Sequence, residues 1–462
     1  MNFPKNFLWG GASSAFQVEG ASTLNKGRTV ADMRSDLAKE RLGIASTDVA
    51  SDFYHHYKED IQLMKECGLK AFRMSISWAR IFNDASGSAN LEGIQFYHDV
   101  FDELLANDIQ PIVTLYHFDL PLWTVEKYNG FVSRECIDDF MKYCKLCFEE
   151  YGSKVKYWLT INEQSVITMI PAFQGLDNLK DCWQSYHHMN LANALVNKMY
   201  HEMNLGGMIG PAISYTTVYP ASPDPKDIMI AWHSDDIHVF SLTDVAVYGK
   251  YPKYFINELE KNGYMFEMQD GDDAILTDPL AKPDYFGLNW YCTSVIGHYI
   301  GEDMFGEYKG PDLPRQERAV KGEYQYYKNP YTPYSEYNWN CDGIGLRYAM
   351  RKMYQMYHLP IIITENGWSA NETVGEDGCI HDQERIHYLE ENIQGMSDAI
   401  NDGVELIGYT PWSFIDLLSA SQGMDKRYGL VFVDRTNDDL KELKRIPKDS
   451  FYYYQKIIKE NS

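Results

Sequence analysis

The sequence contains little positive charge for its size. Its 462 residues include 42 Lys and Arg against 66 Asp and Glu, so the formal net charge is −24. A chain of this charge repels polyanions, and the composition therefore argues against nucleic acid or an anionic membrane as a partner. It also repels small anions, so an anionic substrate would need a local cluster of cations to hold it.

Long hydrophobic runs and secretion signals are missing as well. No apolar stretch approaches the roughly 18 residues that a membrane-spanning helix needs. Residues 1–6 lack a charged segment followed by an apolar one, which is the pattern of a secretory leader. The eight Cys show no spacing typical of a disulfide framework. These absences together predict a protein of the reducing cytoplasm.

Several motifs of catalysis and cofactor binding are absent too. The sequence has no glycine-rich loop for phosphate groups, no Gly-x-Ser-x-Gly and no His-Glu-x-x-His. Cys144 and Cys147 have the spacing of a redox or metal pair, but they lie inside an amphipathic helical pattern without a second pair. That setting favours two buried thiols. We accordingly predict neither a metal ion nor any other cofactor.

What the sequence does contain is an alternation of short apolar runs with amphipathic stretches. Eight runs predict strands, which begin at Leu8 or span residues 71–78, 111–117, 157–163, 207–214, 284–291, 360–365 and 404–412. Helical periodicity lies between them, including residues 52–67, 91–107, 133–151, 345–358 and 383–401. Such alternation gives parallel strands, and eight of them close a barrel. We therefore predict an α/β fold with a single (β/α)8 TIM barrel over residues 1–462, whose long βα loops form the active-site pocket.

Two of the predicted strands end in a glutamate. Residues 360–364 run directly into Glu365, and residues 157–162 run into Glu163. A single acid in this place could simply cap the segment that follows it. Two acids at the tips of barrel strands lie where the loops converge on one cavity, and a pair of carboxylates there suggests cleavage of a glycosidic bond.

Three other polar residues stand out on or after predicted strands. Arg73 lies within a strand, where a guanidinium is costly to bury unless it is paired, so we expect it to point at a carboxylate. His117 ends a strand and could be a core histidine, a general base or a donor to a sugar hydroxyl. Gln17 follows the first strand in a loop of small residues and is predicted to point inward. Residues 301–340 have no clear period and are predicted to form a wall of the pocket.

Five motifs in the same order along the chain resemble family 1 glycoside hydrolases. They are Phe7–Gly10 with Gln17–Gly20, Arg73–Trp78, Leu115–Pro121, Asn162–Glu163 with Thr364–Gly367, and Trp412 with Lys426–Leu430. The resemblance covers nearly the whole chain and implies a (β/α)8 barrel with Glu163 as acid/base and Glu365 as nucleophile. It further implies a sugar cradle of Gln17, His117, Asn162 and Trp412, with Arg73 and Tyr291 beside the nucleophile. An Arg and a Tyr hydroxyl would stabilise a charged Glu365, whereas Glu163 without such partners can carry a raised pKa and donate a proton.

The loop after Trp412 departs from the pattern of family members that act on plain glucosides. Where those members have Glu-Trp, this sequence has Ser419-Ala420. Loss of the acid removes a repulsive charge, and the loop offers Ser419 or Ser421, Lys426 and Tyr428 as donors to a phosphate. The loop therefore resembles the 6-phospho-β-glucosidase branch, and Ala420 in place of Trp favours the glucoside over the galactoside.

Three further residues bear on whether the chain resembles the phospho-branch or the plain glucosidases of the family. Asn289 resembles the plain-glucosidase pattern, whereas Gln164 after the acid/base favours the phospho-branch. Trp339 lies in a segment that resembles a pocket wall of the phospho-branch, and we expect it to contact the substrate. The expected function is retaining hydrolysis of a phosphorylated β-glucoside. The alternatives are a plain β-glucosidase, a 6-phospho-β-galactosidase and a non-catalytic sugar-phosphate binding protein, and a homo-oligomer is compatible with each.

Overall fold

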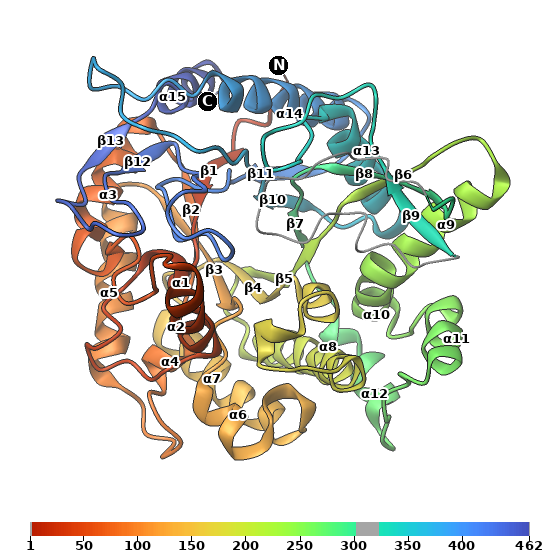
Figure 1. The fold of residues 1–462 in the computed structure, drawn as a ribbon. Helices are drawn as coiled ribbons and strands as arrows, with labels where there is room; N and C mark the ends of the chain where they lie inside the picture. The colour runs from red at the N-terminus through yellow and green to blue at the C-terminus, as the bar shows by residue number, and fades with distance from the viewer. Residues whose placement is uncertain (1, 302–322, 462) are drawn as a thin grey trace.

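A computed structural model describes residues 2–301 and 323–461 of the chain. Its centre is a closed barrel of eight parallel strands in the order β1-β11-β10-β7-β5-β4-β3-β2 (Figure 1). These strands are β1 Leu8–Ala12, β2 Ala71–Ser75, β3 Gln110–Tyr116, β4 Tyr157–Asn162, β5 Met208–Ser214, β7 Phe286–Asn289, β10 Ile361–Glu365 and β11 Leu406–Tyr409. Each of the eight predicted strands is present, and the predicted (β/α)8 barrel is confirmed.

The barrel interior is a packed core. All five residues of β10 are buried, because strands of a parallel barrel are covered on both faces. Side chains that point into the barrel pack on one another, among them Ala71, Ile112, Leu159 and Ile362, each fully buried. This packing explains why the strands read in the sequence as continuous apolar runs rather than as alternating ones.

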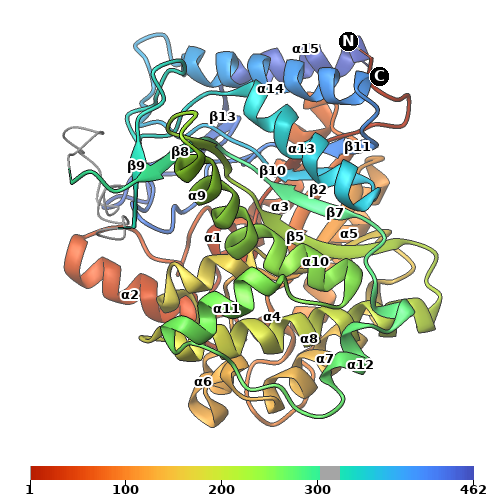
Figure 2. The ribbon, with the colours of Figure 1, turned by 90° about the vertical axis from the view of Figure 1, so that its right-hand side faces the viewer.

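Helices surround the barrel on all sides (Figures 1 and 2). The longer ones are α2 Val30–Leu42, α3 Phe53–Cys67, α5 Leu91–Ala106, α7 Glu135–Tyr151, α8 Leu179–Met203, α9 Pro225–Asp235, α11 Lys253–Asn262, α13 Gly343–Tyr357, α14 Gln383–Asn401 and α15 Asp449–Asn461. Shorter helices are α4 Trp78–Ile81, α6 Leu122–Tyr128, α10 Ser241–Tyr248 and α12 Asp272–Leu276. The five helices predicted from periodicity are confirmed, and α3 ends at Gly68 in the left-handed conformation that a glycine stop favours. None of the helices in the described ranges combines the length and the apolar character that a membrane span requires.

The segment after β1 differs from the expectation. Residues 15–18 form a short helix, α1 Ala15–Val18, instead of a loop. The backbone N–H of Ala15 donates to Ser75 Oγ over 2.8 Å, which ties this turn to the end of β2. Gln17 is buried within the turn, as the inward orientation predicts.

Two small sheets lie outside the barrel. One pairs β6 Thr217–Pro220 with β8 Thr293–His298, and β8 in turn pairs with β9 Tyr324–Tyr327. The other joins β12 Val431–Val433 to β13 Arg445–Pro447. The expected pocket wall at residues 301–340 falls in part on residues 302–322, which lie outside the described residues. The remainder contains β9, a regular strand for which the sequence shows no period.

Candidate active site

Glu163 and Glu365 both lie at the carboxyl ends of barrel strands. Glu365 is the last residue of β10, and Glu163 directly follows β4. Glu163 adopts φ 46°, in the left-handed region that few residues other than glycine occupy. Such backbone strain is typical of functional sites, and here it turns the chain away from the strand direction at the acid itself.

Both carboxylate oxygens of Glu365 accept hydrogen bonds. Arg73, which is fully buried, places Nη1 2.5 Å from Glu365 Oε1. The Tyr291 hydroxyl donates to Oε2 over 2.5 Å. Arg73 therefore faces a carboxylate, as expected of a buried guanidinium. The two donors stabilise negative charge on Glu365, which is the form that a nucleophile requires.

Two asparagines connect the acids to each other. Asn162 Oδ1 accepts from Arg73 Nη2 at 2.6 Å and from Asn289 Nδ2 at 3.0 Å. Asn289 Nδ2 also lies 3.1 Å from Glu163 Oε1, and the Thr364 hydroxyl donates to Asn289 Oδ1. A continuous hydrogen-bond chain thus runs from Glu365 to Glu163. The sequence indicates Asn289 only as a marker of the branch, although its place near the end of a predicted strand is a signal for a site residue.

The surroundings of Glu163 favour its protonated form. Burial and, to a lesser degree, the negative charge of Glu365 raise the pKa of Glu163 to about 8, while the hydrogen bond from Asn289 opposes the shift. At neutral pH the carboxyl therefore carries a proton that it can donate. Burial likewise raises the pKa of Tyr291 well above its usual range, so this hydroxyl remains a donor to Glu365.

His117 lies in the site rather than in the core behind it. Its Nε2 is 3.4 Å from Asn162 Nδ2, and its ring stacks on Trp412 at 5.8 Å between centroids. Burial lowers the pKa of His117 well below the usual range, so the imidazole is neutral. Among the described residues, His117 Nδ1 has no hydrogen-bond partner. A neutral imidazole has one donor and one acceptor nitrogen, so in this place it can hydrogen-bond a sugar hydroxyl. This role fits the geometry better than that of a general base.

Gln17 joins the first βα loop to the loop after β11. Its Oε1 accepts from Ser14 Oγ at 2.7 Å, and its Nε2 donates to the Leu418 carbonyl at 2.8 Å. Gln17 therefore lies next to Ser419, the first residue of the loop expected to hold phosphate.

That loop makes a tight turn that brings its two serines together. Ser419 and Gly423 exchange backbone hydrogen bonds of 2.8 and 3.2 Å. The Ser419 and Ser421 hydroxyl oxygens lie 3.4 Å apart. Gly423 has φ 60°, and a Cβ there would meet Asn437 Oδ1 at 2.0 Å, so the turn needs glycine at this position.

Lys426 is buried among aromatic rings. Its Nζ lies 4.6 Å from the ring centroid of Trp339, 4.9 Å from that of Tyr337 and 5.8 Å from that of Tyr428. Cations are attracted to the faces of such rings. The Trp339 ring is also 4.9 Å from the ring of Tyr291, so it connects the surroundings of Lys426 with those of Glu365.

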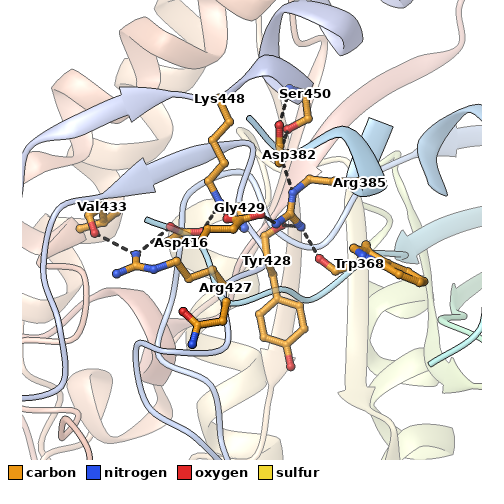
Figure 3. A network of polar contacts seen from close by, with 12 residues as sticks. Trp368, Asp382, Arg385, Asp416, Arg427, Tyr428, Gly429, Val433, Lys448 and Ser450 are labelled. Carbon is orange, nitrogen blue, oxygen red and sulfur yellow. Dashed lines mark hydrogen bonds and ion pairs between the residues drawn. The ribbon is translucent and has the colours of Figure 1, made fainter. Parts of the chain in front are cut away.

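A network of buried ion pairs fixes the backbone that carries Lys426 and Tyr428 (Figure 3). Asp416 accepts from Arg427 Nη1 at 2.9 Å, from Lys448 Nζ at 2.8 Å and from the Gly429 N–H at 2.9 Å. Arg385 Nη1 donates to the Tyr428 carbonyl over 2.9 Å. The Tyr428 ring points away from this network in Figure 3. These contacts hold the backbone of residues 427–429 in place and leave the Tyr428 ring outside the network.

The thiols of Cys144 and Cys147 are both buried along α7, in agreement with the buried-thiol interpretation. In the described parts of the chain, no cluster of three or more His, Cys, Asp or Glu side chains could hold a metal ion.

Comparison with known proteins adds independent information. A family model described as Glycosyl hydrolase family 1 matches residues 1–462. The aryl-phospho-β-D-glucosidase BglC of Bacillus subtilis is 39% identical, over 100% of this chain and 98% of that protein. The 6-phospho-β-glucosidase AscB of Escherichia coli is 36% identical, over 99% of this chain and 98% of that protein. A solved structure of a family 1 β-glucosidase from Thermotoga maritima superposes with a TM-score of 0.87 at 29% identity, over 100% of this chain and 99% of that one.

Proposed function

Because this chain belongs to glycosyl hydrolase family 1, we propose that it hydrolyses 6-phospho-β-D-glucosides to glucose 6-phosphate and the aglycone. The observation that carries the proposal is the burial of Lys426 beside Trp339, whose ring contacts the Tyr291 partner of Glu365. The names of BglC and AscB, which match over nearly the whole chain, support a phosphorylated β-glucoside as substrate. The protein is accordingly an O-glycosyl hydrolase.

In the proposed mechanism Glu163 acts first as an acid. Its carboxyl gives a proton to the glycosidic oxygen as the bond to the anomeric carbon breaks. Glu365, with Arg73 and Tyr291 on its two oxygens, attacks the anomeric carbon from the other face and forms a glycosyl-enzyme. Glu163, now charged, then takes a proton from water, and that water releases glucose 6-phosphate with retained configuration.

The phosphate and the sugar hydroxyls are held by separate groups of residues. Ser419, Ser421, Lys426 and Tyr428 bind the phosphate, because a protein of net charge −24 must offset that dianion locally. The residues proposed to bind the sugar ring are Gln17, His117, Asn162, Trp412 and Trp339. Both groups come from the carboxyl ends of the barrel strands and from the segments that follow them, which is where TIM barrels place their active sites.

Residues 1–462 form one catalytic domain that needs no cofactor. It acts in the cytoplasm on a small phosphorylated sugar, without nucleic acid or membrane as a partner.

One assay tests the proposed substrate. It compares nitrophenyl β-glucoside, its 6-phosphate and nitrophenyl β-galactoside 6-phosphate under identical conditions. The proposal expects the highest kcat/KM for the glucoside 6-phosphate. A higher value for the plain glucoside or for the galactoside 6-phosphate would contradict it, and no turnover of any of the three would point to a binding protein.

A further inference from the structure

Gln164, the residue after the acid/base, is held at both ends of its side-chain amide. Its Nε2 donates to Asn190 Oδ1 over 2.7 Å, and its Oε1 accepts from Asn193 Nδ2 at 2.6 Å. Both asparagines lie on α8, and Gln164 itself is 1% exposed. The helix therefore clamps the first side chain of the 3-10 turn η2 Gln164–Thr168, which leads away from Glu163.

The hydrogen-bond donors in this clamp all point the same way. The Thr160 hydroxyl of β4 donates to Asn193 Oδ1 over 2.5 Å, and Asn190 Nδ2 donates to the Tyr251 hydroxyl over 3.0 Å. Each amide thus accepts from one neighbour and donates to the next, from Thr160 through Gln164 to Tyr251. A buried chain in which every member is satisfied holds each amide in one orientation.

The far end of the chain is anchored by an ion pair. The His187 ring contacts the Tyr251 hydroxyl through Nδ1 at 2.9 Å and Asp272 Oδ2 through Nε2 at 3.0 Å. Arg134 holds the same carboxylate with two hydrogen bonds of 2.6 and 3.1 Å. These contacts tie α8 to α12 and to the start of α7, so the clamp on Gln164 cannot shift without breaking buried hydrogen bonds.

Glu163 needs such a support because its own backbone is strained. With φ 46° and ψ 47° it occupies the left-handed region, and a residue other than glycine stays there only where its surroundings over-determine its conformation. The Glu163 N–H donates to the Ala212 carbonyl over 2.8 Å, and the Glu163 carbonyl accepts from the Val166 N–H at 2.9 Å. These two bonds hold the backbone of the acid, whereas the clamp fixes the direction in which the chain leaves it.

We propose that Gln164 is a positioning residue for the acid/base. Its clamped amide holds Glu163 in the left-handed conformation, and with it the carboxyl beside Asn289, where it faces the glycosidic oxygen. Because both ends of the amide are bound to α8, Gln164 acts through Glu163 rather than on the substrate. The inference rests on the proposed function for the substrates of its test, whereas the need for a placed proton donor is common to β-glucosides with and without phosphate.

The test compares Gln164→Met with the wild type on two substrates that differ in their need for an acid. Cellobiose phosphorylated on its non-reducing glucose releases a sugar that must be protonated, whereas nitrophenyl β-glucoside 6-phosphate releases a group that needs little protonation. Methionine has nearly the length of glutamine and removes both hydrogen bonds of the clamp. The ratio of kcat/KM for the disaccharide to kcat/KM for the nitrophenyl substrate should fall by roughly 10- to 100-fold, the equivalent of two hydrogen bonds. The loss should appear mainly in kcat for the disaccharide, because the clamp does not bind substrate.

A matched control separates positioning from stability. Tyr251→Phe removes the hydroxyl that Asn190 and His187 share, so it weakens the same network but leaves both contacts of the Gln164 amide in place. The ratio in Tyr251→Phe should stay at the wild-type value even if its thermal midpoint falls.

The outcomes that overturn the inference are equal losses on both substrates in Gln164→Met, an unchanged ratio in that variant, or an equal fall of the ratio in Tyr251→Phe. If Gln164→Met does not fold, Asn190→Ala removes one contact of the clamp and should lower the ratio by roughly 2- to 10-fold. If the wild type cleaves only unphosphorylated substrates, the proposed function fails, while the same ratio measured with cellobiose and nitrophenyl β-glucoside still tests Gln164.

Discussion

Arg73 Nη1 lies 2.5 Å from Glu365 Oε1, and the two side chains are 0% and 5% exposed. Desolvating such a pair is costly unless further hydrogen bonds complete it. Here Thr114 and Asn162 accept from the other guanidinium nitrogens, and Tyr291 donates to the second carboxylate oxygen. The nucleophile is thus held in one orientation before substrate binds, which lowers the cost of reaching the transition state.

The first prediction separates the roles of the two acids. Glu365→Ala should abolish turnover with every leaving group, because no glycosyl-enzyme can form. Glu163→Ala should slow cleavage of a phosphorylated disaccharide by roughly 100- to 10,000-fold, the usual contribution of general acid catalysis. A nitrophenolate needs little protonation to leave. The rate at which nitrophenolate is first released should therefore fall much less in Glu163→Ala than the rate of disaccharide cleavage. Equal losses on both substrates in Glu163→Ala would contradict its assignment as the acid.

The second prediction concerns pH. Glu163 must be protonated to act as an acid, and its pKa is raised to about 8. The kcat/KM for a phosphorylated disaccharide should therefore fall as the pH rises through about 8. The phosphate of the substrate has its second pKa at about 6, so its charge does not account for a decline through about 8. The residual activity of Glu163→Gln on the same disaccharide should lack this decline, and its persistence would assign the titration to another group.

The third prediction is geometric. The carboxyl groups of Glu163 and Glu365 should lie about 5 to 5.5 Å apart, as retaining glycosidases require. A crystal structure measures this separation, and proton NMR of the first product formed shows its anomeric configuration. A separation of about 8 Å together with an α-configured product would indicate inversion and exclude the glycosyl-enzyme.

The barrel and its two acids could be predicted because their signals are local. Strands buried on both faces read as unbroken apolar runs, and Glu163 and Glu365 each follow such a run directly. Arg73 could be recognised for the same reason, since one charge within an apolar strand requires a partner.

The contacts between distant residues could not be read in this way. Asp416 pairs with Lys448, 32 positions later, and Arg385 reaches Tyr428 across 43 positions. Nothing in the local pattern distinguishes these side chains from ordinary surface residues of a helix or loop.

The fourth prediction concerns stability. Asp416→Ala removes the carboxylate that the buried cations Arg427 and Lys448 share. The substitution should lower the free energy of unfolding by roughly 3 to 5 kcal/mol. The control is Asp402→Ala, which breaks the exposed pair with Arg347 and should cause a much smaller loss. Urea unfolding of both variants measures the difference, and similar midpoints would show that the network does not stabilise the loop.

The most direct measurement is the kcat/KM of Lys426→Ala on nitrophenyl β-glucoside 6-phosphate and on the unphosphorylated glucoside. One charge-assisted hydrogen bond to the phosphate accounts for a loss of roughly 10- to 150-fold on the phosphorylated substrate. The ratio of kcat/KM for the phosphorylated glucoside to kcat/KM for the unphosphorylated one is the phosphate preference, and it should fall by that factor. The control Lys441→Ala, at an exposed ion pair with Asp434, should keep the wild-type preference. An unchanged preference in Lys426→Ala, through either no loss or an equal loss on both substrates, would contradict a phosphate site at Ser419, Ser421, Lys426 and Tyr428.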